Sequence, residues 1–163
     1  MDTQVIQAVP VRLLRNPIHL LTLGFGSGLS PKMPGTFGTL TGVILYLLFM
    51  PTSNWLIYSI IVAFCFFTGI SMCSYTAKAL NVHDHPAIVW DEIVGFWLVM
   101  LLVPKTWVWI LVGFVLFRFF DILKPWPIKM IDNKVKGGLG IMLDDAIAAL
   151  FSLIIIQIII YLL

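Results

Sequence analysis

Five apolar runs, separated by short polar segments, constrain the fold of this chain more than any other feature. They cover residues 40–50, 55–75, 87–103, 106–123 and 146–163. With 60% hydrophobic and 11% charged residues, the chain has more apolar side chains than a soluble domain of this size normally carries. A helix needs about 20 apolar residues to cross a hydrocarbon core of about 30 Å. We therefore predict an all-α integral membrane bundle of about five spans, with residues 1–163 forming a single domain.

The segment before the first run has a mixed character. In residues 11–29, apolar side chains recur beside Arg12, Arg15 and His19, which predicts a short interfacial or re-entrant helix. Residues 30–39 form a loop rich in proline and glycine, and Pro34 is well placed to open a helix. The first run is short, so it crosses the bilayer only if this loop dips into it.

Lysine and arginine are distributed unevenly between the runs. If all five runs cross, one side of the membrane carries nearly all of them and the other carries Lys105 alone. The positive-inside rule then places the first side in the cytoplasm and predicts a multi-pass membrane protein. The net charge of +2 is too small to favour nucleic acid, and an anionic lipid membrane is the expected partner. No sequence feature indicates an oligomeric state.

Half of the charged side chains lie between residues 118 and 145. The predicted topology brings this window to the same membrane face as an acidic pair at the start of the third run. Acids within membrane segments usually mark functional sites, because an unpaired one costs about 2.5–3.5 kcal/mol on insertion scales. Carboxylates without cysteine form the oxygen-only ligand set that suits Mg²⁺. The candidate metal ligands are Asp91, Glu92, Asp121, Asp144 and Asp145.

Each of these acids also has a purely structural interpretation. An ion pair with Arg118 would account for Asp91 or Glu92. Arg118 and Asp121 are three residues apart, so a local ion pair on one helical face would account for the latter. A helix N-terminus at the last run would stabilise one carboxylate of Asp144 and Asp145, but not both.

Basic side chains at the same face would suit a phosphate group. Guanidinium groups and the free N–H groups of a helix N-terminus both bind this anion. The candidate phosphate-binding residues are Lys32, Thr36, Arg118 and Lys124. A further polar group, His83, Asp84 and His85, would provide a ligand, a proton shuttle or a loop cap.

Acids for a metal beside bases for a phosphate indicate metal-assisted phosphoryl chemistry. Other phosphatase chemistries lack their residues here. A cysteine phosphatase needs an arginine six positions after its cysteine, but Ser71 and Ala79 stand there. Acids two positions apart, which an aspartyl-phosphate enzyme needs, and a Ser-Gly-His element are also absent from the sequence. Water is therefore the expected nucleophile.

Four motifs resemble those of the phosphatidylglycerophosphatase A family. They are GFGSGLSPKMPGTFGT at 24–39, VHDHPAIVWDEIVG at 82–95, FRFFDILKPWPI at 117–128 and GGLGIMLDDAIA at 137–148. The resemblance implies Mg²⁺-dependent hydrolysis of phosphatidylglycerophosphate to phosphatidylglycerol and inorganic phosphate at the cytoplasmic face of the bacterial inner (cytoplasmic) membrane. One or two Mg²⁺ ions would be held by the five acids. Glu92 is the first choice for the catalytic base, with Asp91, Asp121 and Asp145 as the other catalytic candidates.

Three rival functions remain at this stage. A transport subunit would distribute its acids through the membrane depth, whereas these lie near one end of each run. A non-catalytic lipid-binding protein would need the basic residues but not five acids. A phosphotransferase acting on CDP-activated lipids would also use acids and a metal, but its characteristic spacing of acids and glycines is absent from the sequence.

Overall fold

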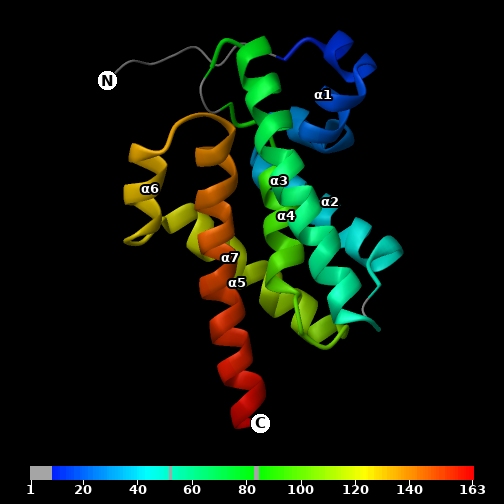
Figure 1. Cartoon of the computed structure of the whole chain (residues 1–163), viewed down its shortest axis with the longest axis vertical. Coiled ribbons are helices and arrows are strands. Elements are labelled where there is room, and N and C mark those ends of the chain that lie inside the picture. The colour runs from blue at the N-terminus through cyan, green and yellow to red at the C-terminus, as the bar shows by residue number, and fades with distance from the viewer. Residues whose placement is uncertain (1–8, 52, 83–84) are drawn as a thin grey trace.

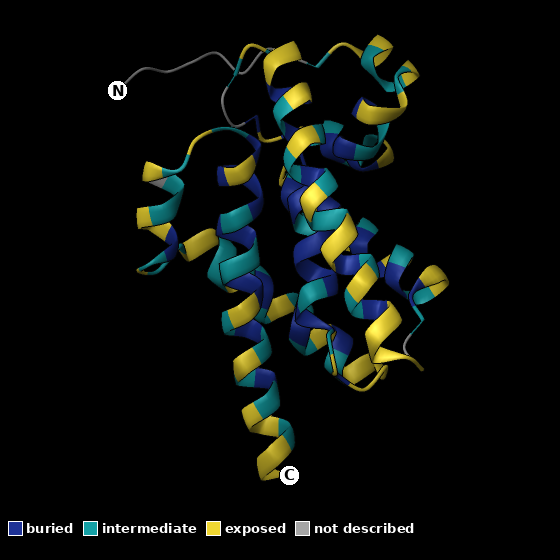
Figure 2. Cartoon of the chain, in the orientation of Figure 1, coloured by how far each residue is buried: buried dark blue, intermediate teal, exposed yellow. Residues whose placement is uncertain are grey.

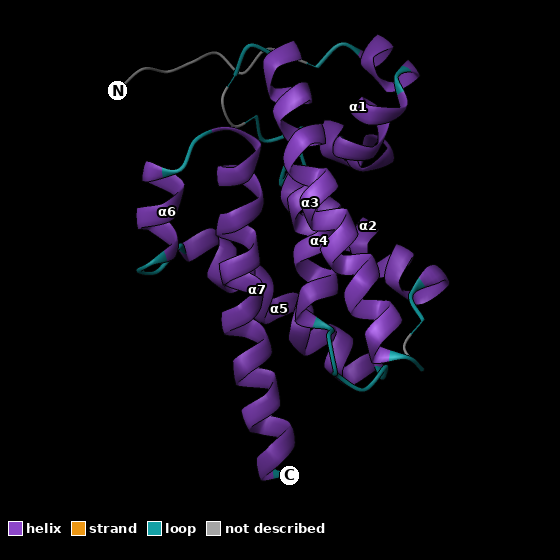
Figure 3. Cartoon of the chain, viewed as in Figure 1, coloured by secondary structure: helices purple, strands orange, loops and turns teal. Residues whose placement is uncertain are grey.

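The computed structural model describes residues 9–51, 53–82 and 85–163, and these residues form helices, turns and loops without a strand (Figure 3). This confirms the predicted all-α class. The elements in chain order (Figure 1) are η1 (Val11–Arg15), α1 (Pro17–Thr22), η2 (Gly24–Leu29), α2 (Pro34–Phe49), α3 (Trp55–Ala79), α4 (Trp90–Val99), α5 (Trp107–Leu123), α6 (Ile128–Lys134) and α7 (Gly137–Leu162). His83 and Asp84, two of the candidate polar residues, lie outside the described residues.

Helices α3 and α7 are the longest elements of the bundle. They have 25 and 26 residues with mean hydropathies of 2.2 and 2.3, and among the described helices these two are long and apolar enough to cross a membrane. Helices α2 and α5 have 16 and 17 residues. At about 1.5 Å per residue they fall somewhat short of a hydrocarbon core of about 30 Å. Five complete spans are thus a prediction that the helix lengths do not confirm.

The third apolar run forms a short helix in the core of the protein. Helix α4 has ten residues, which at about 1.5 Å each rise only about 15 Å, half the thickness of a hydrocarbon core. Eight of its residues are buried, and Figure 2 shows it mostly in the buried colour. It packs against α2, α3, α5 and α7. The run is apolar because other helices surround it, and sequence composition does not distinguish this from contact with lipid.

The last helix begins earlier than its apolar run predicts. Glycines such as Gly137, Gly138 and Gly140 are typical of a turn, but α7 starts at Gly137. Gly138 lies against the backbone carbonyl of Ile70 in α3, where a Cβ would overlap the oxygen, so the glycine allows the two helices to approach closely. Asp144 and Asp145 therefore lie about two turns inside α7. The helix-terminus explanation for these acids is wrong, because that effect fades within the first turn.

The segment before α2 does not form one interfacial helix. It forms η1, α1 and η2, with a kink inside η2 where Phe25 has a φ of 58°. Helix α1 is attached to the end of α3 through Thr76, whose Oγ1 lies 2.9 Å from Nδ1 of His19 and 2.7 Å from Oγ1 of Thr22. This segment is therefore a cap on one end of the bundle (Figure 1). Pro34 occupies the first turn of α2, as the sequence predicts.

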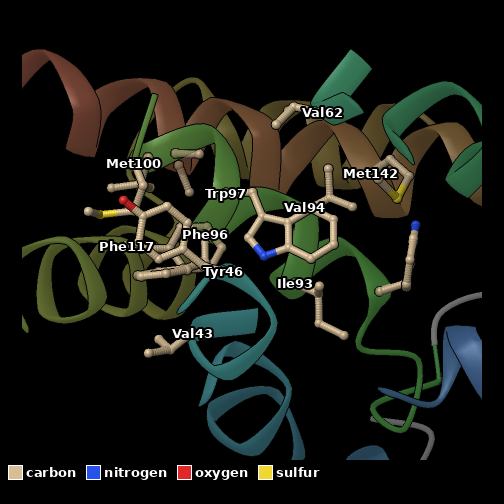
Figure 4. Close-up of a cluster of buried hydrophobic side chains, with 14 of the residues drawn as sticks. Val43, Tyr46, Val62, Ile93, Val94, Phe96, Trp97, Met100, Phe117 and Met142 are labelled. Atoms are coloured by element: carbon tan, nitrogen blue, oxygen red, sulfur yellow. The ribbon is translucent and has the colours of Figure 1, made fainter. Parts of the chain in front are cut away.

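Helix α4 is fixed to its neighbours by side-chain bonds to backbone carbonyls. Trp97 Nε1 donates to the carbonyl of Gly42 in α2 at 2.9 Å, and the hydroxyl of Tyr58 in α3 donates to the carbonyl of Trp97 at 2.6 Å. Tyr46 and Phe96 meet edge to face nearby, with ring centroids 6.0 Å apart (Figure 4). These contacts fix the last turns of α4, whereas Asp91 and Glu92 lie in its first turn.

Candidate active site

One polar cavity of about 260 Å³ gathers most of the predicted site residues. It lies where the first turns of α2 and α4 meet the end of α5 and the third turn of α7. Residues far apart in the sequence thus converge, as the topology argument predicts. The charged residues that line it are Asp91, Glu92, Asp121, Asp144, Asp145, Arg118 and Lys124.

Three of the acids form a compact group. Asp91, Glu92 and Asp145 each offer a carboxylate oxygen, and these oxygens all lie within 4.8 Å of one another. Asp145 is buried, and the side chain of Glu92 is only 12% exposed. Oδ2 of Asp145 and Oε2 of Glu92 are buried and make no hydrogen bond to any described residue. Carboxylates this close repel unless a cation or a proton lies between them.

This group has the chemistry of a hard-cation site. Its donors are carboxylate oxygens, the ligands that Mg²⁺ prefers, and two of these buried oxygens have capacity for a further partner. The residues therefore fit the metal that the sequence predicts. Asp121 and Asp144 lie at the same cavity but make ion pairs with basic residues instead of joining the compact group.

Arg118 connects three helices at the cavity wall. Its Nη1 lies 2.7 Å from Oδ2 of Asp121 on the next turn of α5, which confirms the ion pair expected from their spacing. The same nitrogen lies 3.9 Å from Oε1 of Glu92 in α4 and 3.5 Å from Oγ1 of Thr39 in α2. The guanidinium is thus a mostly buried cation held against the acidic group. Gly35 of α2 packs against both Glu92 and Arg118.

Lys124 projects a second cation into the cavity from the end of α5. Its Nζ lies 2.6 Å from Oδ2 of Asp144 and 3.2 Å from Oδ1 of Asp132. Partial burial disfavours the ammonium, but the hydrogen bond and charge of Asp144, with a contribution from Asp132, raise the net pKa of Lys124 above its ordinary value. The residue has a left-handed backbone conformation, with a φ of 41°, where the helix ends. It therefore remains a cation throughout the physiological range.

Three other candidates do not line the cavity. Lys32 is exposed in the loop before α2. The N–H of Thr36 is not free, because it donates to the carbonyl of Met33 at 3.0 Å within the first turn. His85 is buried, and its Nδ1 accepts a hydrogen bond from the N–H of Ala87 at 3.1 Å, which is the loop-cap role. A phosphate contact by Lys32 or Thr36 stays a prediction.

Three contributors to the site were missed in the sequence. Thr39 accepts from Arg118 and donates to the carbonyl of Gly35 at 2.9 Å. Asp132 shares Lys124 with Asp144. Gly35 matters through its lack of a side chain. Of the three, only Thr39 could have been noticed from the sequence, because it lies one helical turn after Gly35. Asp132 and Gly35 contribute through contacts with other elements, which the sequence does not show.

Comparison with protein families identifies the relationships of the chain. The model of the family described as phosphatidylglycerophosphatase A matches residues 20–160, a range that contains every residue lining the polar cavity. The chain belongs to the phosphatidylglycerophosphatase A family. The family resemblance found in the four sequence motifs is therefore confirmed.

Curated relatives agree with this assignment. A phosphatidylglycerophosphatase A of Haemophilus influenzae is 49% identical over 88% of this chain and 88% of its own length. One from Escherichia coli K12 is 46% identical over 85% of this chain and 81% of its own length. A Bacteroides thetaiotaomicron protein, provisionally named a phosphatidylinositol-3-phosphatase, is 37% identical over 85% of this chain and 91% of its own length. No solved structure gave a significant match.

Proposed function

We propose that this protein hydrolyses phosphatidylglycerophosphate to phosphatidylglycerol and inorganic phosphate, using Mg²⁺ bound by the acidic group. The observation that carries the proposal is the single polar cavity in which Asp91, Glu92 and Asp145 face Arg118 and Lys124. Relatives 49% and 46% identical to this chain are named for this activity. The acids that would hold a metal and the bases that would bind a phosphate therefore line the same cavity.

The basic residues bind the phosphate. Arg118 offers a planar set of N–H donors that matches phosphate oxygens, and Lys124 adds a point charge. Asp121 and Asp144 hold these two cations in place through their ion pairs. We accordingly assign Asp121 and Asp144 chiefly to positioning the bases, although the sequence also suggested them as metal ligands.

The acidic group activates water. Asp91, Glu92 and Asp145 would hold Mg²⁺, which when bound supplies a Lewis acid that polarises phosphoryl oxygens and makes water a stronger nucleophile. Glu92 accepts a proton from the attacking water, because its Oε2 is buried in the cavity wall and makes no hydrogen bond to a described residue. Water adds to phosphorus, the bond to the glycerol oxygen breaks, and that oxygen takes up the proton that Glu92 accepted, which gives the alcohol.

The protein works in the membrane that contains its substrate. We propose that α3 and α7 cross the bilayer and that α2 and α5 extend most of the way, with α4 enclosed between them. By the positive-inside rule, the basic loops support a position of the polar cavity at the cytoplasmic face of the inner membrane. Trp107, at the opposite end of α5 from Lys124, is 73% exposed and suits the other interface as an aromatic anchor.

Phosphate release from the purified full-length protein in detergent micelles tests this proposal. Substrates should be phosphatidylglycerophosphate, phosphatidic acid and phosphatidylinositol 3-phosphate, each with Mg²⁺ and with EDTA. We expect release from the first substrate, its loss in EDTA and its recovery when Mg²⁺ is restored. Full activity in EDTA would refute the metal assignment, and preference for the phosphoinositide would refute the substrate.

Two variants locate the activity in the cavity. Asp91→Asn should abolish release, because it removes one carboxylate of the acidic group without changing its size. Lys78→Gln is the control, because it also replaces a charged group by an amide but at an exposed position outside the cavity lining. Replacing the substrates by CDP-diacylglycerol and an alcohol acceptor tests the rival phosphotransferase function, for which we expect no product.

A further inference from the structure

A second cavity adjoins the polar one and has the opposite chemistry. It has a volume of about 320 Å³ and lies between α3, α4 and α7. Apart from Ser59 and Asp91, its lining side chains are apolar. Three of them, Val62, Val94 and Met142, come from the three different helices (Figure 4). We refer to this cavity as the apolar groove.

The apolar groove begins at the acidic group and runs away from it along the bundle. Asp91 lines both the groove and the polar cavity, so the two adjoin at this residue. On α4 the lining extends from Asp91 to Leu98, and on α3 it extends from Phe67 back to Ser59. Eight positions of a helix correspond to about 12 Å, so the groove is about that long.

The groove opens sideways between the two candidate membrane spans. Phe67 of α3 is 67% exposed and Leu150 of α7 is 44% exposed, although both line it. When α3 and α7 stand in a bilayer, this opening faces hydrocarbon. An apolar chain can therefore enter laterally without crossing water.

We propose that the apolar groove binds one acyl chain of the phosphorylated lipid while Arg118 and Lys124 hold its phosphate. The inference rests on the proposed function, because it extends the same site to the other end of the substrate. A lipid phosphate bound in the polar cavity must lead its chains towards hydrocarbon, and the groove is an apolar path that starts at Asp91. A helix from a second copy is about 10–12 Å across and fits this volume poorly.

Filling the groove tests the proposal. Ala63 lies on its α3 wall and is exposed, so Ala63→Phe narrows the groove without disturbing the core. Ser59→Phe obstructs its far end. Ala79→Phe is the matched control, because it makes the same change at an exposed position of α3 that does not line the groove. Each purified variant should be assayed with long-chain and with short-chain, water-soluble phosphatidylglycerophosphate.

We expect Ala63→Phe to raise KM for the long-chain substrate at least tenfold while changing kcat/KM for the short-chain substrate less than twofold. Ser59→Phe should also impair the long-chain substrate more than the short-chain substrate, by a smaller factor. Ala79→Phe should affect the two substrates equally. Equal effects on both substrates, or no effect on either, would overturn the groove assignment. So would a loss of oligomers in Ala63→Phe, measured by sedimentation, because the face would then bind a second copy.

Assays of the wild-type protein with both substrates distinguish a failure of the acyl groove from a failure of the proposed function on which it rests. If it releases no phosphate from either substrate, the proposed function fails. If it hydrolyses both and Ala63→Phe does not discriminate between them, the proposed function stands and the acyl groove fails. Thermal unfolding of each variant in the same detergent shows whether it is folded.

Discussion

Gly35 in α2 lies so close to Glu92 in α4 that a Cβ on the glycine would overlap Oε1 of the carboxylate. The same Cβ would lie 3.0 Å from both terminal nitrogens of Arg118. This packing brings the backbone of α2 to the wall of the polar cavity. It also fixes the side chain of Glu92 without a hydrogen bond from α2.

Gly35→Ala should therefore displace the Glu92 carboxylate. Overpacking of this kind typically costs about 1–3 kcal/mol, and we expect a corresponding loss of stability together with a loss of kcat. Thermal unfolding and phosphate release measure the two effects. In the double variant Gly35→Ala/Glu92→Asp, the shorter side chain should restore stability but not activity. Additive losses of stability would show that the two residues do not interact in this way.

Lys124 should contribute to phosphate binding through its charge. Lys124→Met should lower kcat/KM by about 10- to 100-fold, because a hydrogen bond to a charged group contributes about 1.5–3 kcal/mol. Lys78→Met, which removes an exposed lysine outside the cavity, is the control. Similar losses in both variants would mean that general attraction to an anionic lipid surface explains the effect.

The pH dependence of Lys124 follows from its ion pairs. Its pKa is raised because the hydrogen bond and charge of Asp144, with that of Asp132, outweigh partial burial. Because its pKa is raised, the ammonium stays protonated at pH values up to and through the ordinary pKa of lysine. Its contribution to phosphate binding is therefore lost only at higher pH. The alkaline limb of the activity profile should then be the same in wild type and in Lys124→Arg. If the alkaline limb lies at higher pH in Lys124→Arg than in wild type, Lys124 titrates in that limb.

Removing one acid from the compact group should stabilise the metal-free protein. Asp91, Glu92 and Asp145 repel one another within 4.8 Å, so Asp145→Asn relieves that repulsion while abolishing activity. Each 1 kcal/mol of relief raises Tm by about 2–4 °C in a protein of this size. Thermal unfolding in EDTA should show this increase, and added Mg²⁺ should then stabilise wild type more than the variant. A lower Tm for Asp145→Asn in EDTA would contradict the prediction.

The site was more predictable from the sequence than the arrangement of helices. Charged residues in an apolar chain are few, and those with a role at a shared site must converge, so Asp91, Asp121 and Asp145 could be placed together from topology alone. Which of these acids form the compact group and which pair with a base was not predictable. Whether an acid joins a metal group or pairs with a base depends on approaches between helices, such as that of Lys124 to Asp144.

The differences between the expected and the observed helices have a common cause. The run containing α4 and the run containing α7 are both apolar, but α4 is enclosed by protein whereas α7 includes exposed residues such as Ile154, which is 55% exposed. Hydropathy reports the transfer of a side chain out of water and does not identify what replaces the water. Similarly, Gly138 resembled a turn residue because its contact with α3 is remote in sequence.

Tyr58 should stabilise the bundle without affecting the chemistry. Its hydroxyl donates to the carbonyl of Trp97 at 2.6 Å and joins α3 to α4 near the end of α4 that is distant from Asp91. Tyr58→Phe removes this bond while keeping the ring, so we expect a loss of about 1 kcal/mol in the free energy of unfolding. Phosphate release per folded molecule should stay within twofold of wild type. Tyr161→Phe, at an 88% exposed position near the end of α7, is the control and should leave both quantities unchanged. A large loss of activity in Tyr58→Phe without a loss of stability would show that this hydrogen bond, and not packing alone, sets the position of α4.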